Sequence, residues 1–230
     1  MKLSYDLHLH SCLSPCGDAE MTPNNIVNMA ALLGLDLIAV SDHNSALNLP
    51  AVFKAVSSVD LLVVPAIEAC SSEEVHLLCL FETLDGALEC SSIFRKALPP
   101  IRNKPEFFGE QQILNANDEW IGSEELLLIN ALSLNIKQVQ DAVQSCGGMV
   151  IPAHVNKKAY SLLAVLGSIP EEYRFSCIEV NPPDNSLPFA GHRISDSDAH
   201  TLEQMQEPSH FIELPERSTK ALLDTLCGRI

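Results

Sequence analysis

Residues 3–10 read Leu-Ser-Tyr-Asp-Leu-His-Leu-His, and this stretch at the start of the chain decides the fold. Apolar and polar residues alternate along it, which is the two-residue period of a β-strand with unlike faces. Asp6, His8 and His10 fall on one face, because side chains alternate along a strand. The first predicted strand therefore supplies both core residues and candidate functional residues.

Further short apolar runs follow, with helical patterns between them. This alternation predicts repeated βα units around a mainly parallel sheet, and so an α/β fold. The predicted strands are Leu3–Leu9, Leu35–Val40, Leu61–Ile67, Val75–Phe81, Met149–Ala153, Cys177–Val180 and Arg193–Ser195, with Phe211–Leu214 as a candidate eighth strand.

Two helices have readable ends. Thr22 is a good N-cap, Pro23 suits the first helical position, and Gly34 can end the first helix. A second helix is expected from a cap at Asp85 to Leu98, where two consecutive prolines would stop it.

The strand–helix rhythm breaks in residues 82–147, which we interpret as an insertion within a single domain spanning 1–230. The insertion is predicted to be mainly helical, and an insertion on the rim of a barrel often shapes a substrate pocket. Its expected elements are a hairpin within 111–122 that turns at Asn115–Asp118, and helices at Glu124–Ala131 and Ile136–Cys146.

Composition limits the function classes. A chain of 230 residues with 47% hydrophobic residues can bury one sizeable core. The net charge of −16 disfavours binding to long nucleic acid, although bound cations would reduce it, and it does not exclude a small phosphorylated substrate. We expect a cytoplasmic protein without a membrane partner, because the sequence shows neither a secretory signal nor an apolar run of membrane-spanning length.

The eight cysteines are scattered and are interpreted as reduced thiols. Cys12 and Cys16 form a CxxxC pair beside the first histidines. Two isolated cysteines at this spacing are a weak metal signal, so we interpret them as ordinary thiols.

Nearly every predicted strand carries or is followed by a residue that can bind a metal. The C-terminal ends of parallel barrel strands converge on one rim, so we expect these side chains to become neighbours. Histidine with carboxylate suits zinc, manganese or iron. The residues are His8, His10, Asp42, His43, Glu68, His76, His154, Asp198 and His200.

Each of these residues also has an ordinary interpretation. A single histidine such as His76 is usually a core or surface residue, and Asp42, Glu68 and Asp198 could be cap or turn residues. These interpretations would all have to hold at the same structural position. His192 and His210 lie near the starts of their runs and are assigned no role.

At His8-x-His10, Ser41-Asp42-His43, Glu68, Glu74-Val75-His76, Pro152-Ala153-His154 and Ser197-Asp198-Ala199-His200, the sequence resembles the polymerase and histidinol phosphatase (PHP) family. The resemblance spans nearly the whole chain. It implies a distorted seven-stranded, TIM-like (β/α)7 barrel with a trinuclear metal site. The insertion resembles the branch that includes nucleotide and oligonucleotide phosphoesterases.

The resemblance also implies a ligand set for two to three divalent ions of zinc, manganese or iron. His8, His10, Glu68 and Asp198 would hold one ion, Asp18, His43 and His200 a second, and Glu68, His76 and His154 a third. Glu68 would bridge two ions. Asp18 follows a loop that is longer than the family form, which sets it apart from the other ligands.

The implied reaction is the metal-dependent hydrolysis of a phosphoester by a metal-bridging hydroxide, without a protein nucleophile. The predicted substrate is a nucleotide or short oligonucleotide. The alternatives are a phosphomonoesterase for a small metabolite such as histidinol phosphate and a non-catalytic metal-binding module. Asp6 and Asp42 are candidate partners of the histidine ligands, and Lys104, Lys157 and Lys158 are candidates for binding a second phosphate.

Overall fold

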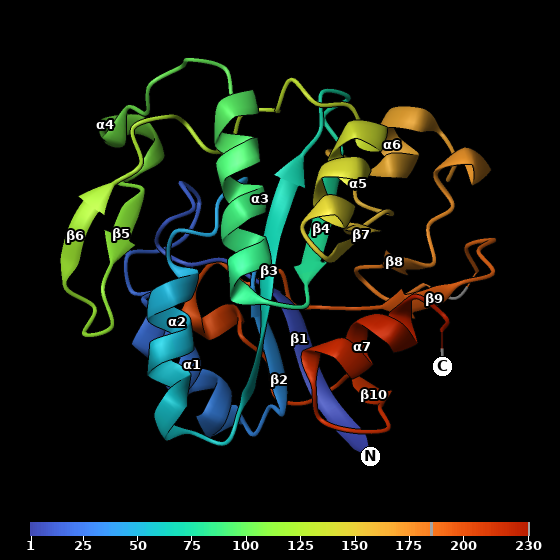
Figure 1. Ribbon diagram of the computed structural model, residues 1–230, viewed down its shortest axis with the longest axis horizontal. Helices are drawn as coiled ribbons and strands as arrows, with labels where there is room; N and C mark the ends of the chain where they lie inside the picture. The colour runs from blue at the N-terminus through green and yellow to red at the C-terminus, as the bar shows by residue number, and fades with distance from the viewer. Residues whose placement is uncertain (185, 230) are drawn as a thin grey trace.

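The chain, described for residues 1–184 and 186–229 by a computed structural model, has an α/β fold built on a curled mixed sheet (Figure 1). Six strands lie in the order β10-β1-β2-β3-β4-β7. Their bounds are β1 Lys2–Leu9, β2 Leu37–Val40, β3 Leu62–Cys70, β4 His76–Phe81, β7 Gly148–Pro152 and β10 Phe211–Glu213. A separate parallel pair consists of β8 (Cys177–Glu179) and β9 (His192–Ile194).

All eight predicted strands are present, but the expected mainly parallel sheet was wrong for the six-stranded sheet. Strands β1, β2 and β3 are parallel, whereas the pairs β3–β4, β4–β7 and β1–β10 are antiparallel. The reason for β3–β4 is the connection: only residues 71–75 separate the two strands, too few for a crossover. The sheet continues locally toward β8 and β9, because Val155 N–H donates to the Glu179 carbonyl at 2.9 Å and Leu9 bridges Ala199.

The helices are α1 Pro23–Leu33, α2 Leu49–Ala55, α3 Leu84–Ala97, α4 Pro105–Phe108, α5 Ile136–Ser145, α6 Leu162–Leu166 and α7 Thr219–Leu226, with 3-10 turns at Val56–Ser58, Glu171–Tyr173 and Leu202–Gln204. Helix α1 begins and ends as predicted, since Thr22 accepts from Asn25 N–H and Gly34 adopts a left-handed φ of 80°. Helix α3 is capped by Thr83, and the predicted cap Asp85 lies in its first turn instead. None of the helices in the described ranges is both long and apolar enough to span a bilayer.

The insertion contains α3, α4, α5 and the hairpin of β5 (Gln112–Leu114) and β6 (Trp120–Ser123), which projects to the left in Figure 1. The predicted turn and the helix from Ile136 are both present. The predicted helix at Glu124–Ala131 was wrong. The Gln111 side chain donates to the carbonyls of Glu124 and Leu126, each at 2.7 Å, so this backbone is held in extended and turn conformations.

The sheet is buried on both faces. Ile38 and Val40 belong to a cluster with residues of α1, α3 and α5, while Leu37 and Ala39 face a second cluster that includes Leu222 of α7. Figure 1 shows α3 and α5 standing in front of the sheet. Because both faces are covered, the ends of the strands are where polar side chains can gather.

Candidate metal centre

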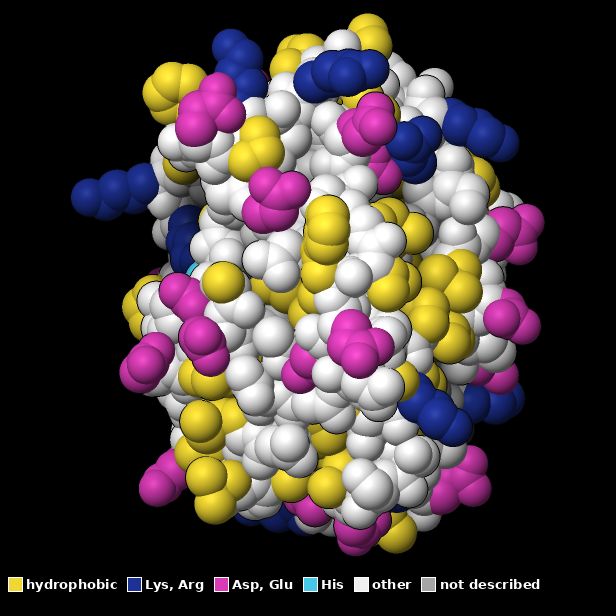
Figure 2. All heavy atoms as spheres, turned by 90° about the vertical axis from the view of Figure 1, so that its left-hand side faces the viewer, with side chains coloured by type: hydrophobic (Ala, Val, Ile, Leu, Met, Phe, Trp, Pro, Cys, Tyr) yellow, Lys and Arg dark blue, Asp and Glu magenta, His cyan; other side chains and the backbone are white. Residues whose placement is uncertain are grey.

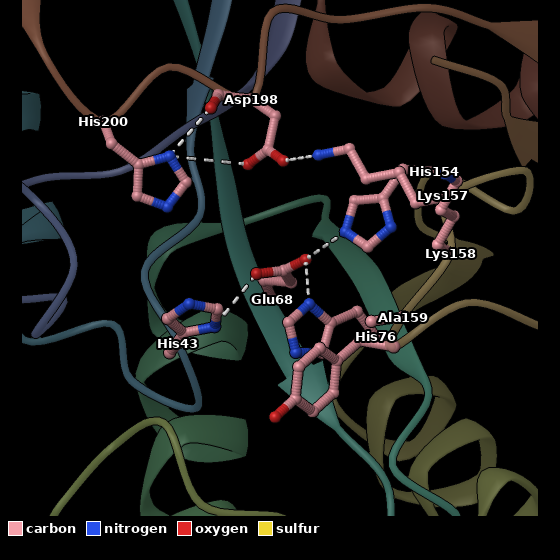
Figure 3. A pocket seen from close by; sticks show the side chains of 10 residues that line it. His43, Glu68, His76, His154, Lys157, Lys158, Ala159, Asp198 and His200 are labelled. Carbon is pink, nitrogen blue, oxygen red and sulfur yellow. Dashed lines mark hydrogen bonds and ion pairs between the residues drawn. The ribbon is translucent and has the colours of Figure 1, made fainter. Parts of the chain in front are cut away.

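Five imidazole rings surround the carboxylate of Glu68, which lies near the end of β3 and is almost fully buried. Figure 3 shows Glu68 between the rings of His43, His76 and His154. The shortest nitrogen–oxygen distances to Glu68 are 3.3 Å from His8, 3.5 Å from His10, 2.9 Å from His43, 2.9 Å from His76 and 3.2 Å from His154.

Four strands of the six-stranded sheet, β1, β2, β4 and β7, position these rings, and His154 follows β7. His8 and His10 come from the end of β1, and His43 follows β2 and forms a parallel bridge with Glu68. His76 begins β4, so its place in the site does not follow from the expectation that ligands lie at the C-terminal ends of parallel strands. It reaches the same rim because β4 is antiparallel to β3, with His76 opposite Cys70.

Asp198 and His200 complete the cluster from the loop after β9. An oxygen of Asp198 lies 3.2 Å from His10 Nε2 and 3.5 Å from His8 Nε2. His200 Nδ1 lies 2.8 Å from the Asp198 backbone carbonyl and donates to it. The Lys157 ammonium group pairs with the second Asp198 oxygen (Figure 3). Asp198 thus connects the β1 histidines to the loop that follows His154.

Hydrogen bonds fix the orientation of the two β1 histidines. His8 Nδ1 donates to Glu179 at 2.9 Å. Ser14 gives its hydroxyl hydrogen to Asp42 at 2.7 Å, so its oxygen accepts from His10 Nδ1 at 3.1 Å. The Nε2 atoms of both rings are therefore unprotonated in the neutral form, and both are buried without a hydrogen-bond partner.

This arrangement tests whether the residues fit metal ions. The free nitrogens of His8 and His10 face carboxylate oxygens at 3.2–3.5 Å, which is unfavourable unless a proton or a metal cation lies between them. Three groups of ligand atoms also lie within 4.8 Å of one another: His8, His10 and Asp198; His43, Glu68 and His76; and His10, Cys16, His43 and His200. Buried imidazole and carboxylate groups in such numbers fit several divalent cations.

The charges of the ion-free site agree with this fit. Burial would raise the pKa of Glu68, but His76, His8 and His43 outweigh it and hold this pKa well below its usual range. Burial lowers the pKa of His10 to about 3. Burial also opposes protonation of His43, yet Glu68 raises its pKa to about 10. A proton on His43 therefore balances the Glu68 charge, and a bound cation can replace that proton.

Eight of the nine predicted ligands meet at this site, and Asp18 does not. Asp18 is exposed, and its carboxylate accepts from Glu20 N–H at 2.8 Å within its own turn. Its backbone N–H donates to the His200 carbonyl at 2.8 Å. Asp18 therefore holds the loop beside His200 while its side chain takes no part in the three groups. His154 contacts Glu68 but also lies outside those groups.

Two predicted partners act differently from the expectation. Asp6 accepts from the backbone N–H of Ser197 at 3.1 Å and from its hydroxyl at 2.6 Å, so it anchors the Asp198 loop and contacts neither histidine ring. Asp42 reaches His10 only through Ser14. Lys157 and Lys158 line the cavity of about 380 Å³ beside the cluster, whereas Lys104 precedes α4 in the insertion and is not among the lining residues.

Sequence reasoning missed three residues. Glu179 is fully buried and accepts from His8 Nδ1, and its position at the end of a predicted strand was a usable signal. Tyr160 stacks on His76 with ring centroids 4.8 Å apart. Cys16, interpreted above as an ordinary thiol, lies with His10, His43 and His200. For Tyr160 and Cys16 the sequence offered no signal strong enough to choose them.

The fold and the buried cluster of histidine and carboxylate groups fit a metal-binding protein of a known family. Residues 6–144, more than half of the chain, match the PHP domain. The chain belongs to the PHP domain family, as its motifs predicted. No curated protein sequence matches it significantly.

Solved structures share the fold at low sequence identity. The lesion-specific endonuclease PfuEndoQ of Pyrococcus furiosus superposes with a TM-score of 0.69 at 19% identity, over 99% of this chain and 56% of that chain. A Bifidobacterium adolescentis protein described as a metal-dependent phosphoesterase gives a TM-score of 0.61 at 18% identity, over 96% of both chains. An amidohydrolase of Chromobacterium violaceum, with bound sulfate and no metal, gives 0.57 at 16% identity, over 97% and 96%. The chain thus spans little more than half the length of the endonuclease.

Proposed function

We propose that the chain hydrolyses phosphoesters of nucleotides or short oligonucleotides at the Glu68 cluster. Two or three divalent ions would be held by His8, His10, His43, Glu68, His76, His154, Asp198 and His200, within a barrel that closes through β8 and β9. Bound divalent ions at such a site activate water and stabilise the charge on phosphoryl oxygens. The observation that carries the proposal is the set of buried histidine nitrogens without hydrogen-bond partners that face Glu68 and Asp198.

The chain's own residues orient these groups. Glu179 fixes the His8 ring, and Ser14 with Asp42 fixes the His10 ring, so that both Nε2 atoms point to the carboxylates. Lys157 and Lys158 line the cavity and supply positive charge for a phosphate group. Hydrolysis by an activated water needs no serine or cysteine nucleophile from the described residues around the cluster.

The position of Tyr160 favours a substrate that has an aromatic group. It lines the same cavity as Glu68, stacks on His76, and remains 46% exposed, so part of its ring is accessible from solvent. Stacking of a nucleobase on an aromatic ring contributes about 1–3 kcal/mol. A nucleotide with its phosphate near Lys157 would have its base within the same cavity as Tyr160.

The surface charge supports a small substrate. Figure 2 shows acidic side chains spread over the face that carries the β5–β6 hairpin, with basic side chains nearer its margins and apolar and neutral atoms between them. The net charge of −16 for the whole chain disfavours a long polyanion, whereas a cation-filled cavity attracts one phosphate. Endonuclease Q has been solved in complex with a 27-mer duplex that carries an abasic lesion, but this chain covers only 57% of that longer protein.

A substrate panel with added manganese tests the proposal. Nucleoside monophosphates, nucleoside bisphosphates, dinucleotides, histidinol phosphate and glycerol phosphate would be compared. We expect a higher kcat/KM for the nucleotides, and Tyr160→Leu should reduce this advantage about 5- to 150-fold while leaving glycerol phosphate hydrolysis unchanged.

Two variants test the site itself. His8→Ala and Asp198→Ala should abolish hydrolysis while circular dichroism shows a retained fold, because the core consists of apolar strand residues. A preference for histidinol phosphate would favour the metabolite phosphatase instead. Metal binding without hydrolysis of any substrate would favour the non-catalytic module.

A further inference from the structure

Cys16 lies at the edge of the cluster in a group with three histidines. Its sulfur and one nitrogen each from His10, His43 and His200 all lie within 4.8 Å of one another. Ligands around a tetrahedral zinc ion lie about 3.3–3.8 Å apart, given bond lengths of 2.0–2.3 Å. Small side-chain rotations would therefore bring these four atoms to the spacing that zinc requires.

The His10 ring, whose free nitrogen also faces Asp198, indicates that an ion lies in this group. His10 is fully buried, and its Nδ1 atom is committed to Ser14, so Nε2 is the nitrogen it can offer. That Nε2 atom has no hydrogen-bond partner. The His10 ring also stacks on His200 with centroids 4.2 Å apart and lies 4.7 Å from His43. Three closely packed imidazoles with an unpartnered buried nitrogen are an arrangement that a cation stabilises.

The loop is built to bring Cys16 back over His10. Ser14 N–H donates to the Ser11 carbonyl at 3.0 Å and Gly17 N–H donates to the Ser14 carbonyl at 2.9 Å, which makes two successive turns. Gly17 is required there, because a Cβ atom at that position would lie 2.2 Å from the Ser11 carbonyl oxygen. The same turns leave Asp18 paired through its backbone with His200 and turned outward.

Cys16 also differs from the other cysteines. It is the exposed one, Cys227 is half-buried beside Met149, and the remaining six are buried. A buried cysteine fills core space, whereas an exposed cysteine beside three histidines has no packing role to explain it.

We propose that Cys16 takes the ligand position expected for Asp18 and, with His10, His43 and His200, forms a thiolate–imidazole site that prefers zinc to manganese. Thiolate ligands favour zinc, whereas manganese is better suited to oxygen ligands. One imidazole nitrogen binds one ion, so in this assignment His10 Nε2 binds the Cys16 ion, and His8, Glu68 and Asp198 hold the neighbouring ion. The ion bound by Cys16 would then differ in metal preference from the ions around Glu68. The inference rests on the metal centre of the proposed function and not on its substrate, so its test uses no substrate.

Cobalt substitution detects a thiolate ligand directly. Purified protein freed of metal and titrated with Co²⁺ should show sulfur-to-cobalt charge-transfer absorption, because a thiolate bound to cobalt gives this near-ultraviolet signature. We expect the band to be lost in Cys16→Ser and retained in Cys227→Ser and Asp18→Asn. Circular dichroism of each variant confirms that the fold is retained.

Metal competition measures the preference. Loss of a residue that only supports a ligand costs about 10- to 100-fold in metal affinity. Replacing the ligand sulfur by oxygen in Cys16→Asp should lower the zinc-to-manganese affinity ratio by on the order of 100-fold, while the number of bound ions stays the same.

Several outcomes would overturn the proposal. They are a fully cobalt-loaded wild-type protein without the charge-transfer band, a band that persists in Cys16→Ser, and a zinc-to-manganese ratio that Cys16→Asp leaves unchanged. These results would leave the proposed hydrolysis at the Glu68 cluster standing. Conversely, absence of hydrolysis with the cobalt band present would contradict the proposed function alone.

Discussion

Substitution of Glu179 by glutamine tests how the chain holds a histidine for metal binding. One Glu179 oxygen accepts from His8 Nδ1 at 2.9 Å and from the backbone N–H of His154 at 3.0 Å, in a fully buried position. The amide has one accepting oxygen and no charge, so it cannot support the His8 imidazole as the carboxylate does. Where its NH₂ group faces His8, the ring must change tautomer, which protonates the Nε2 atom that faces Glu68 and Asp198.

The expected magnitude follows from this contact. Carboxylates that orient a ligating histidine contribute about 10- to 100-fold to metal affinity, which is about 1.4–2.7 kcal/mol. Glu179→Gln should therefore weaken the binding of the ion held by His8 within this range, while leaving the fold intact. The measurement is a competition titration of metal-free protein against a chelating dye near neutral pH.

Glu124→Gln is the matched control. Glu124 is also a buried carboxylate, but it accepts from Arg95 at 2.8 and 3.1 Å in the insertion, away from the cluster. This variant should lower the melting temperature and leave metal affinity unchanged. Wild-type metal affinity in Glu179→Gln, or an equal loss of affinity in both variants, would refute the assignment of Glu179 as the residue that orients His8.

Three other changes test separate parts of the site. Glu68→Gln should lower metal content and destabilise the metal-free protein by about 3–5 kcal/mol, since it leaves buried imidazoles without their counter-charge, whereas Asp18→Asn should change neither. Elemental analysis and melting curves decide between these outcomes. The metal-free protein should lose stability as the pH rises from about 6.5, the pKa of histidine in the unfolded state, to about 10. Glu68 raises the pKa of His43 to about 10 in the folded state. Between these two pH values the folded state therefore binds more protons than the unfolded state, and each rise in pH favours unfolding. Melting temperatures with a chelator present, measured for wild type and His43→Gln, check this, and equal pH profiles would contradict it. Gly17→Ala should cost about 1–3 kcal/mol and weaken zinc binding, because its Cβ would meet the Ser11 carbonyl at 2.2 Å. Gly122→Ala, with open space at its Cβ, should be neutral by the same measurements.

The sequence predicted the strands well because burial on both faces leaves a simple pattern. Leu37–Val40 and His76–Phe81 are fully buried, and such apolar runs between turn signals are typical of strands in a covered sheet. Helix α1 could be predicted at both ends, since Thr22 and Gly34 act through local hydrogen bonds and backbone conformation. The helix expected at Glu124–Ala131 was wrong because Gln111, more than ten residues earlier, determines the conformation of that backbone.

The same distinction explains which site residues could be predicted. His8, His43 and Glu68 occupy strands or strand ends, and the strand path alone brings them together once the order β1-β2-β3 is fixed. The choice between Cys16 and Asp18 depends on two turns of a loop and on a contact with a loop nearly 200 residues later. A side chain two positions away in sequence points in another direction after such turns, so residue type and order cannot identify the ligand. The loop that holds Cys16 and Asp18 is therefore where this chain differs from the family pattern, whereas the ligands on the strands follow that pattern.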